Sequence, residues 1–138
     1  MKMKKIIKIL GLVLLLGVGS CSKMPTTFDI VGQWGVFDVT YIFPDLEPTH
    51  LEFTNNHYCE YWTFQVNGIL SVKKNSTNKV DYGDYYYNSN SRKLKFIHDG
   101  YTHYLDADVA EVSPIEMILT VHFSYGGTTI YKMKKLEW

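Results

Sequence analysis

The stretch YGDYYYNSNSRKLKFIH, residues 82–98, shows most clearly how this chain folds. Both of its ends are rich in aromatic or alternating apolar residues, and the polar run 88–91 lies between them. Such a pattern is typical of two antiparallel strands joined by a turn. The chain after residue 30 repeats this pattern, with turn signals about every ten residues. Because no segment keeps a helical apolar period for long, the sequence predicts an all-β protein.

The spacing of the turn signals predicts eight short strands. We expect these strands at residues 33–43, 49–54, 58–66, 82–88, 92–98, 101–112, 116–124 and 128–136. The turns between them fall at 55–56, 88–91, 99–100, 113–114 and 126–127. Asp99-Gly100 is the strongest turn signal, because a type I′ turn needs positive φ at both central residues. Residues 67–81 fit either an additional short hairpin or a loop at one mouth of a barrel.

Sequential strands with tight turns favour an eight-stranded, antiparallel, up-and-down β-barrel. Closing the sheet on itself removes its exposed edges, which would otherwise pair with other chains. An open sandwich is the alternative architecture.

The amino-terminal segment has the order of a secretory signal. Four lysines precede an apolar run of about ten residues, 9–18, which is too short to span a bilayer. Val18-Gly19-Ser20 then places small residues directly before Cys21. This ending resembles the lipobox of bacterial lipoproteins, which implies that Cys21 becomes the acylated amino terminus. We therefore expect a signal peptide at 1–20, a lipidated tether at 21–29 and a barrel domain at 30–138.

The charge balance of the mature chain argues against a nucleic-acid partner. The full chain has 14 basic and 14 acidic residues, and four of the lysines lie within the first eight residues. Removing the signal therefore leaves a net charge of about −4, whereas nucleic-acid-binding proteins usually carry a basic face. Once Cys21 is lipidated, only Cys59 remains, so no intramolecular disulfide can form. We expect Cys59 to be an inert small hydrophobe.

Several motifs resemble bacterial lipocalin-like lipoproteins. Gly32-Gln33-Trp34 is similar to the Gly-x-Trp at the start of lipocalins, whose tryptophan closes one end of the barrel. The stretches 51–56, 83–87, 94–96 and 129–133 are similar to strands of the same family. The last strand carries lysines where lipocalins have an arginine that packs on this tryptophan. The resemblance implies a barrel that is tethered by lipid to the cell envelope, and Ser22 after Cys21 implies the outer membrane, facing the periplasm or the surface.

Strand pairing predicts which side chains face inward, because paired residues share a face. A two-residue turn at 55–56 pairs Phe53 with Tyr58 and Leu51 with Glu60. The same reasoning pairs other residues across the later turns: Tyr85 with Leu94, Phe96 with His103, Val121 with Tyr131, and Leu119 with Met133. The predicted interior is crowded with rings: Trp34, Phe53, Tyr58, Trp62, Phe64, Tyr85, Phe96, Tyr101, Phe123 and Tyr131. Since an eight-stranded barrel is only just wide enough for side chains or one small ligand, we expect a small cavity or none.

The function expected from this interior is non-enzymatic binding of a small hydrophobic or amphipathic ligand. Tyrosine hydroxyls or Glu60 would meet the polar end of the ligand near the mouth. The residues expected to bind it are Tyr58, Glu60, Trp62, Tyr85, Phe96, Tyr101 and Tyr131. The alternative is a filled barrel that engages an envelope protein or a glycan through an exposed aromatic patch, formed by some of Tyr41, Tyr61, Tyr86 and Tyr104.

The sequence contains no recognisable reaction centre. Its five histidines lack the spacings of zinc sites, and only His98 and His103 come close to each other in the expected hairpins. No nucleophile stands with a base and an orienting group in a known signature. We therefore expect a monomer that is not an enzyme and uses no metal or cofactor.

Overall fold

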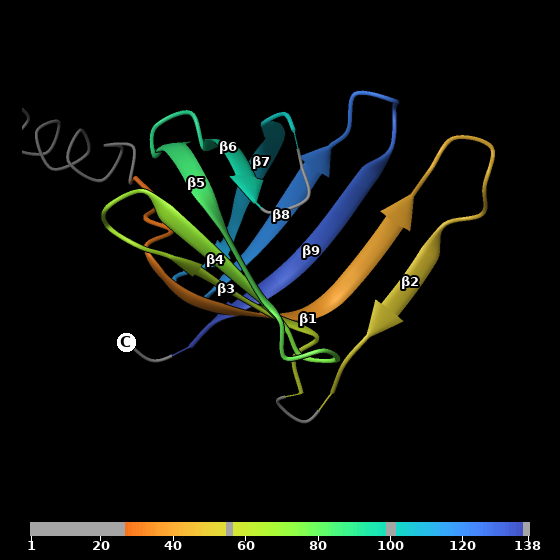
Figure 1. The fold of residues 1–138 in the computed structure, drawn as a ribbon, viewed down its shortest axis with the longest axis horizontal. Helices are drawn as coiled ribbons and strands as arrows, with labels where there is room; N and C mark the ends of the chain where they lie inside the picture. Colours follow the sequence, from red (N-terminus) through yellow and green to blue (C-terminus); the bar gives the residue numbers. More distant parts are fainter. Residues whose placement is uncertain (1–26, 55–56, 99–101, 137–138) are drawn as a thin grey trace, which may run out of the picture.

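The computed structural model describes residues 27–54, 57–98 and 102–136. These residues form nine β-strands (Figure 1). The strands are β1 (Gly32–Ile42), β2 (Thr49–Glu52), β3 (Glu60–Phe64), β4 (Ile69–Lys74), β5 (Val80–Asn88), β6 (Lys93–His98), β7 (Leu105–Ser113), β8 (Glu116–His122) and β9 (Thr128–Lys135). Within the described ranges, no helix has the length and apolar character needed to cross a membrane. The predicted signal peptide and the lipidation site Cys21 lie outside the described residues.

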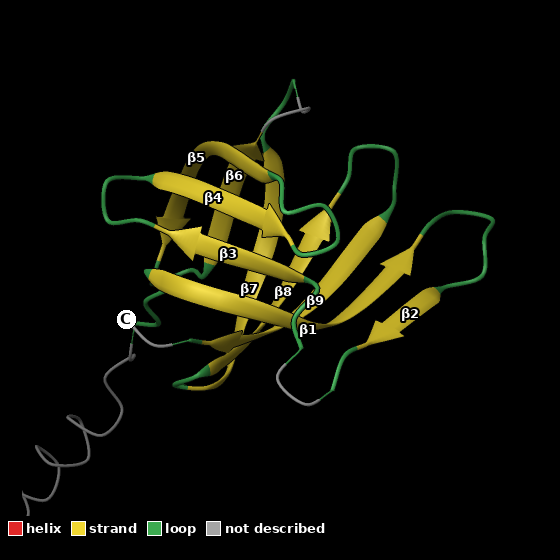
Figure 2. Ribbon diagram, turned by 60° about the horizontal axis from the view of Figure 1, so that its bottom comes forward, coloured by secondary structure: helices red, strands yellow, loops and turns green. Residues whose placement is uncertain are grey.

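The nine strands belong to one antiparallel sheet that closes on itself. Their order is β2-β1-β3-β4-β5-β6-β7-β8-β9, and β9 also pairs with β1. β1 and β3 to β9 therefore form an eight-stranded barrel, and β2 lies outside this ring (Figure 2). The predicted all-β, eight-stranded antiparallel barrel is confirmed. Its composition differs in one strand, because β4 from the uncertain region 67–81 enters the barrel and the expected strand at 49–54 does not.

β1 changes its neighbour halfway along its length. Up to Val36 it pairs with β3, and from Asp38 onward it pairs with β2. A register shift against β9 between these two residues marks a β-bulge, and a bulge bends a strand and increases its twist. β2, the second half of β1 and the first half of β9 consequently project together beyond the barrel (Figure 1). We call this projection the arm, and the barrel is open at the end from which the arm extends.

The opposite end of the barrel is covered by the segment that leads into β1. Phe28 and Ile30 are buried there together with Trp34. The Trp34 Nε1–H donates a hydrogen bond to the Ile30 carbonyl at 2.9 Å. The Lys135 ammonium lies 5.7 Å from the centre of the Trp34 ring system. A lysine thus packs on this tryptophan, in the last strand where the lipocalin pattern has an arginine.

Three hairpins pair two residues away from their predicted registers. Tyr85 pairs with Phe96, Phe96 pairs with Leu105, and Leu119 pairs with Tyr131. Because side chains alternate along a strand, a shift of two residues leaves each of them on its predicted face. The predicted partners are therefore wrong, while the inward orientation of the Phe96 side chain holds.

Loop geometry explains two of these shifts. The β5–β6 loop closes at the pair Asn88–Lys93 and contains Arg92 at a φ of 58°. This left-handed residue lengthens the loop beyond the predicted turn at 88–91. The predicted pairs of the β8–β9 hairpin imply a three-residue loop at 125–127 with Gly127 in the left-handed conformation, whereas Gly126 has the positive φ, at 94°. The loop is therefore displaced by one residue along the chain, which moves the pairing by two.

The predicted pairing between strand 49–54 and strand 58–66 is wrong. Leu51 pairs with Val39 of β1 and not with Glu60. The barrel does not cover it, so Leu51 is 45% exposed. The wrong pairing results from the bulge in β1. It turns the second half of β1 away from β3, and this half pairs with β2 instead.

Tyr58 and Phe53 lie on the outer face of the barrel and not inside it as predicted. The Tyr58 ring packs over Gly35, where an added Cβ would lie 2.6 Å from ring carbons. Gly35 stands between two inward-facing residues of β1, so this contact is on the outside. Tyr58 is buried there, and with Phe53 it lines a small outer pocket of about 190 Å³.

Candidate binding site at the open end of the barrel

A cleft of about 320 Å³ lies at the open end of the barrel. One side comes from the arm and the β8–β9 loop, and the other from β3, β4 and β6. Its lining residues are Tyr41, Phe43, Glu60, Trp62, Val72, Lys74, His98, Phe123, Tyr125, Thr129 and Tyr131. The cleft exists because β1 bends away from β3 at the bulge, which leaves inward-facing side chains of the arm without an opposing strand.

Aromatic rings line this cleft in two groups, which together form its aromatic wall. The ring centres of Trp62 and Tyr131 are 5.2 Å apart. Phe43 stacks between Tyr41, at 6.3 Å, and Tyr125, at 6.2 Å. These rings come from four separate segments of the chain, so the wall depends on closure of the barrel. Large, stiff aromatic surfaces of this kind suit an apolar guest.

The polar side of the cleft centres on Glu60. The carboxylate of Glu60 accepts a hydrogen bond from Trp62 Nε1 at 3.1 Å. Burial raises the pKa of the Glu60 carboxyl, while the hydrogen bond from Trp62 and the charge of Lys74 act in the opposite direction. Trp62 itself is fully buried beneath the cleft, where it forms the floor.

A buried carboxyl, that of Asp81, lies next to Glu60. Asp81 pairs with Val72 across β4 and β5, so it shares the inner face with a residue that lines the cleft. Asp81 is only 6% exposed. Its Oδ2 lies 4.0 Å from His98 Nδ1 and its Oδ1 lies 3.9 Å from Lys79 Nζ. Among the described residues, Asp81 Oδ1 has no hydrogen-bond donor.

Three of the seven predicted ligand-binding residues come together in this cleft. They are Glu60, Trp62 and Tyr131. Phe96 lies in the core and contacts Trp62, with ring centres 5.4 Å apart. The other predicted residues are elsewhere: Tyr58 is on the outer face, Tyr85 donates its hydroxyl to the Gln65 carbonyl near the covered end, and Tyr101 lies outside the described residues.

Sequence reasoning missed the arm and the polar groups of β4 to β6. Tyr41, Phe43 and Tyr125 were not expected at a mouth, because the bulge that exposes the arm has no local signature in the sequence. Asp81 was missed because residues 67–81 had no assigned strand. His98 lies in the predicted strand 92–98, but it was considered only as a neighbour of His103. The alternating pattern of Leu70 and Val72, which are both buried, was the available signal for β4.

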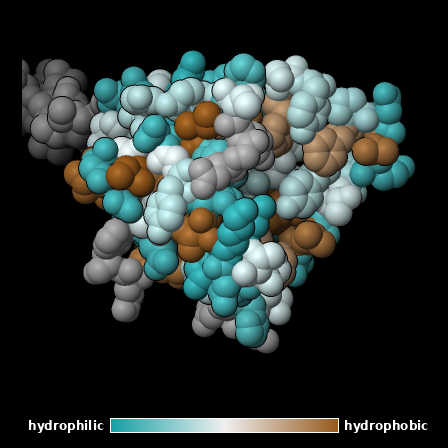
Figure 3. All heavy atoms as spheres, in the orientation of Figure 1, coloured by the Kyte–Doolittle hydropathy of each residue, from teal (hydrophilic) through white to brown (hydrophobic). Residues whose placement is uncertain are grey.

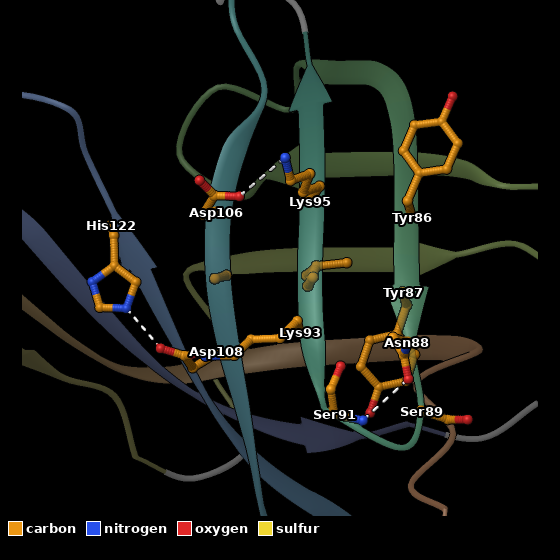
Figure 4. A pocket seen from close by; sticks show the side chains of 12 residues that line it. Tyr86, Tyr87, Asn88, Ser89, Ser91, Lys93, Lys95, Asp106, Asp108 and His122 are labelled. Atoms are coloured by element: carbon orange, nitrogen blue, oxygen red, sulfur yellow. Dashed lines mark hydrogen bonds and ion pairs between the residues drawn. The ribbon is translucent and has the colours of Figure 1, made fainter.

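A larger, open groove of about 780 Å³ runs over the outer face of β5 to β8 (Figure 4). Its charged side chains are already paired, with Lys95 3.8 Å from Asp106 and His122 Nε2 2.8 Å from Asp108 Oδ2. Lys93 also contacts Asp108, and its hydrogen bond is the main cause that lowers the pKa of this carboxyl. Since these groups satisfy one another on a solvated surface, we take the cleft at the open end of the barrel as the candidate site.

Metal ligation and thiol chemistry find little support in this part of the chain. Among the described residues, no group of three or more His, Cys, Asp or Glu side chains is placed to hold a metal ion. Cys59 is half-buried, and burial together with the charge of Glu60 raises the pKa of its thiol to about 12. A thiol with this pKa is almost entirely protonated at neutral pH and is a poor nucleophile.

We therefore expect Cys59 to react slowly with iodoacetamide at pH 8 in the folded protein. Its rate should rise at least about tenfold in denaturant, where the pKa returns toward about 8.5. Mass spectrometry of the peptide that contains Cys59 measures both rates. Equal rates in the folded and unfolded states would contradict the burial of this thiol.

No family model matches the chain, and neither a curated protein nor a solved structure matches it. The described residues therefore define the class of protein by geometry alone. They form an eight-stranded antiparallel β-barrel, covered at one end over Trp34 and open at the other into an aromatic cleft.

Proposed function

We propose that this chain is a lipid-anchored lipoprotein of the cell envelope whose barrel binds a small hydrophobic or amphipathic molecule without converting it. The cleft at the open end carries this proposal. Its volume of about 320 Å³ lies at the lower end of the ~300–1,000 Å³ that is usual for ligand pockets. Aromatic walls with a few convergent polar groups are the usual composition of such sites.

The covered end gives independent support for the lipocalin-like part of the proposal. The resemblance began with Gly32-Gln33-Trp34, and Trp34 is buried at the covered end of the barrel with Lys135 over its ring. A barrel that is plugged at one end directs a guest to the other end. The cleft lies at that other end.

The position of the tether favours a ligand taken from the aqueous compartment. The described chain begins at residue 27, next to the covered end. Cys21 precedes it by six residues, which span at most ~21 Å when fully extended. An acyl group on Cys21 would therefore hold the covered end near the membrane and turn the cleft away from it.

An interaction module with a filled barrel is less well supported. The aromatic patch expected for it is divided, since Tyr41 lies in the cleft and Tyr61 packs against Tyr58. Tyr86, which is 64% exposed, and Tyr104 form only a ring pair at 5.8 Å. Figure 3 shows hydrophobic residues in several separate groups on the face in view, with hydrophilic residues between them.

Calorimetric titration of the full chain in phospholipid nanodiscs with 1-octanol tests the proposal. We expect saturable binding beyond the partitioning into empty nanodiscs. Tyr131→Ser should weaken it roughly tenfold, because a ring contact to the floor of the cleft is lost. Tyr86→Ser, which removes an exposed ring on the outer face, is the matched control and should leave binding unchanged. Absence of saturable binding, or equal loss in both variants, would overturn the proposal.

A further inference from the structure

One buried hydrogen-bond acceptor beside the polar side of the cleft has no donor among the described residues. Asp81 Oδ1 has no hydrogen-bond donor among the described residues, although its side chain is more than nine-tenths buried. The neighbouring carboxylate of Glu60 accepts its bond from Trp62, which forms the floor of the cleft. The two carboxyl groups are close enough for Asp81 to oppose the ionisation of Glu60. A buried acceptor without a donor is costly, so this corner favours a guest that brings donors.

The two lysines near these carboxyls are solvated and weakly engaged, whereas His98, whose Nδ1 lies 4.0 Å from Asp81 Oδ2, is mostly buried. Lys79 Nζ is 3.9 Å from Asp81 Oδ1, which is beyond hydrogen-bond distance, and its side chain is 74% exposed. Lys74 borders the cleft and is also exposed. Ion pairs with exposed lysines of this kind contribute little to stability, because water screens the charges and the side chains lose entropy when they are fixed. A cation within the cleft would therefore compete only with exposed lysines for the negative charge of these carboxyls.

The aromatic wall of the cleft also favours a positively charged guest. Ring faces attract cations, and ammonium groups are recognised in aromatic surroundings. Trp62 and Tyr131 stand beside Glu60 in the cleft. A carboxylate head group would instead face Glu60 and the buried Asp81, where the repulsion between like charges is weakly screened.

We propose that the cleft selects an amphiphile whose polar end is an organic ammonium group, held by Glu60 and attracted by the buried charge of Asp81 beside it, with its alkyl part against the aromatic wall. This inference rests on the proposed function, because it names the chemical class of the ligand at the same site. It differs from that function in requiring a charge preference.

Three probes that share an eight-carbon chain test this preference: octylammonium, 1-octanol and octanoate. Titrated at pH 7.5 below their micellar concentrations, they should bind the full chain in nanodiscs in that order of affinity. A charge-assisted hydrogen bond should favour octylammonium over octanol by roughly tenfold or more. Empty nanodiscs correct each titration for partitioning.

Three substitutions test whether the preference for ammonium arises in the cleft. Glu60→Gln keeps the size of the side chain and should lower the affinity for octylammonium much more than that for octanol. Lys74→Gln removes a competing cation and should strengthen octylammonium binding. Asp106→Asn, in the outer groove, is the control and should leave all three affinities unchanged.

The two proposals fail in distinguishable ways. If octanol binds as tightly as octylammonium, or octanoate binds best, the cleft is a ligand site but the ammonium preference is wrong. A similar loss for octylammonium in Asp106→Asn and Glu60→Gln would also overturn the preference. If no probe shows saturable binding, the proposed function fails together with it.

Discussion

Gly83→Ala is expected to disrupt the barrel, although it adds only one methyl group. A Cβ at Gly83 would lie 1.6 Å from the Ile97 carbonyl oxygen and 2.7 Å from the His98 Cα. Both are backbone atoms of β6, so no side-chain rotation can relieve the overlap, and β5 and β6 would have to separate. We expect a loss of more than about 3 kcal/mol in the free energy of unfolding, measured by urea denaturation.

Asp84→Ala is the matched control for this variant. Asp84 is the next residue of β5 and is exposed, so its replacement should change stability by less than about 0.5 kcal/mol. A Gly83→Ala protein within about 1 kcal/mol of the wild type would show that the two strands do not approach this closely in solution.

The faces of the later hairpins were predictable from sequence, and their registers were not. Alternation within 82–98 places Tyr85 and Phe96 on the inner face, and both are buried. The register depends on loop conformation, and Arg92 with its positive φ is not a residue from which a left-handed turn is expected. Because the resulting shift was two residues, the interior was still predicted correctly there.

Local sequence patterns do not predict which strands join the barrel. Residues 49–52 and 69–74 are both short segments with strand character, yet only the second joins the ring. The choice is made by the β-bulge between Val36 and Asp38, which divides β1 between two partners. The bulge also explains why Leu51 is exposed and why a cleft forms beside the arm.

The site residues that could be predicted are those whose orientation follows from the alternation of side chains along one strand. Glu60 and Trp62 are two residues apart on one strand, so their shared face followed from the strand period. The same reasoning wrongly placed the Tyr58 side chain inside the barrel. The chain before β3 does not continue that strand, and Tyr58 packs over Gly35 on the outer face. Asp81 required knowledge of β4, against which it is registered.

Trp34→Ala is expected to remove a large part of the stability of the barrel. Trp34 is fully buried at the covered end, where it packs against the Phe28 ring and donates a hydrogen bond to Ile30. Loss of a buried tryptophan typically costs ~3–5 kcal/mol, because a cavity is left behind. Thermal and urea unfolding monitored by circular dichroism measure this loss. Tyr86→Ala, which removes an exposed ring, should cost less than about 1 kcal/mol.

The contribution of the Lys135–Trp34 contact to stability can be measured separately from the effect of the cavity. Lys135→Met keeps most of the side-chain volume and removes the ammonium, so the single variant should lose about 0.5–1 kcal/mol, the usual range for an accessible cation over an aromatic ring. In the Trp34→Ala background the same change should cost almost nothing, because the ring that the ammonium contacts is absent. Equal costs in both backgrounds would mean that Lys135 stabilises β9 without acting through Trp34. A loss of less than about 1 kcal/mol for Trp34→Ala itself would contradict its place in the plug at the covered end.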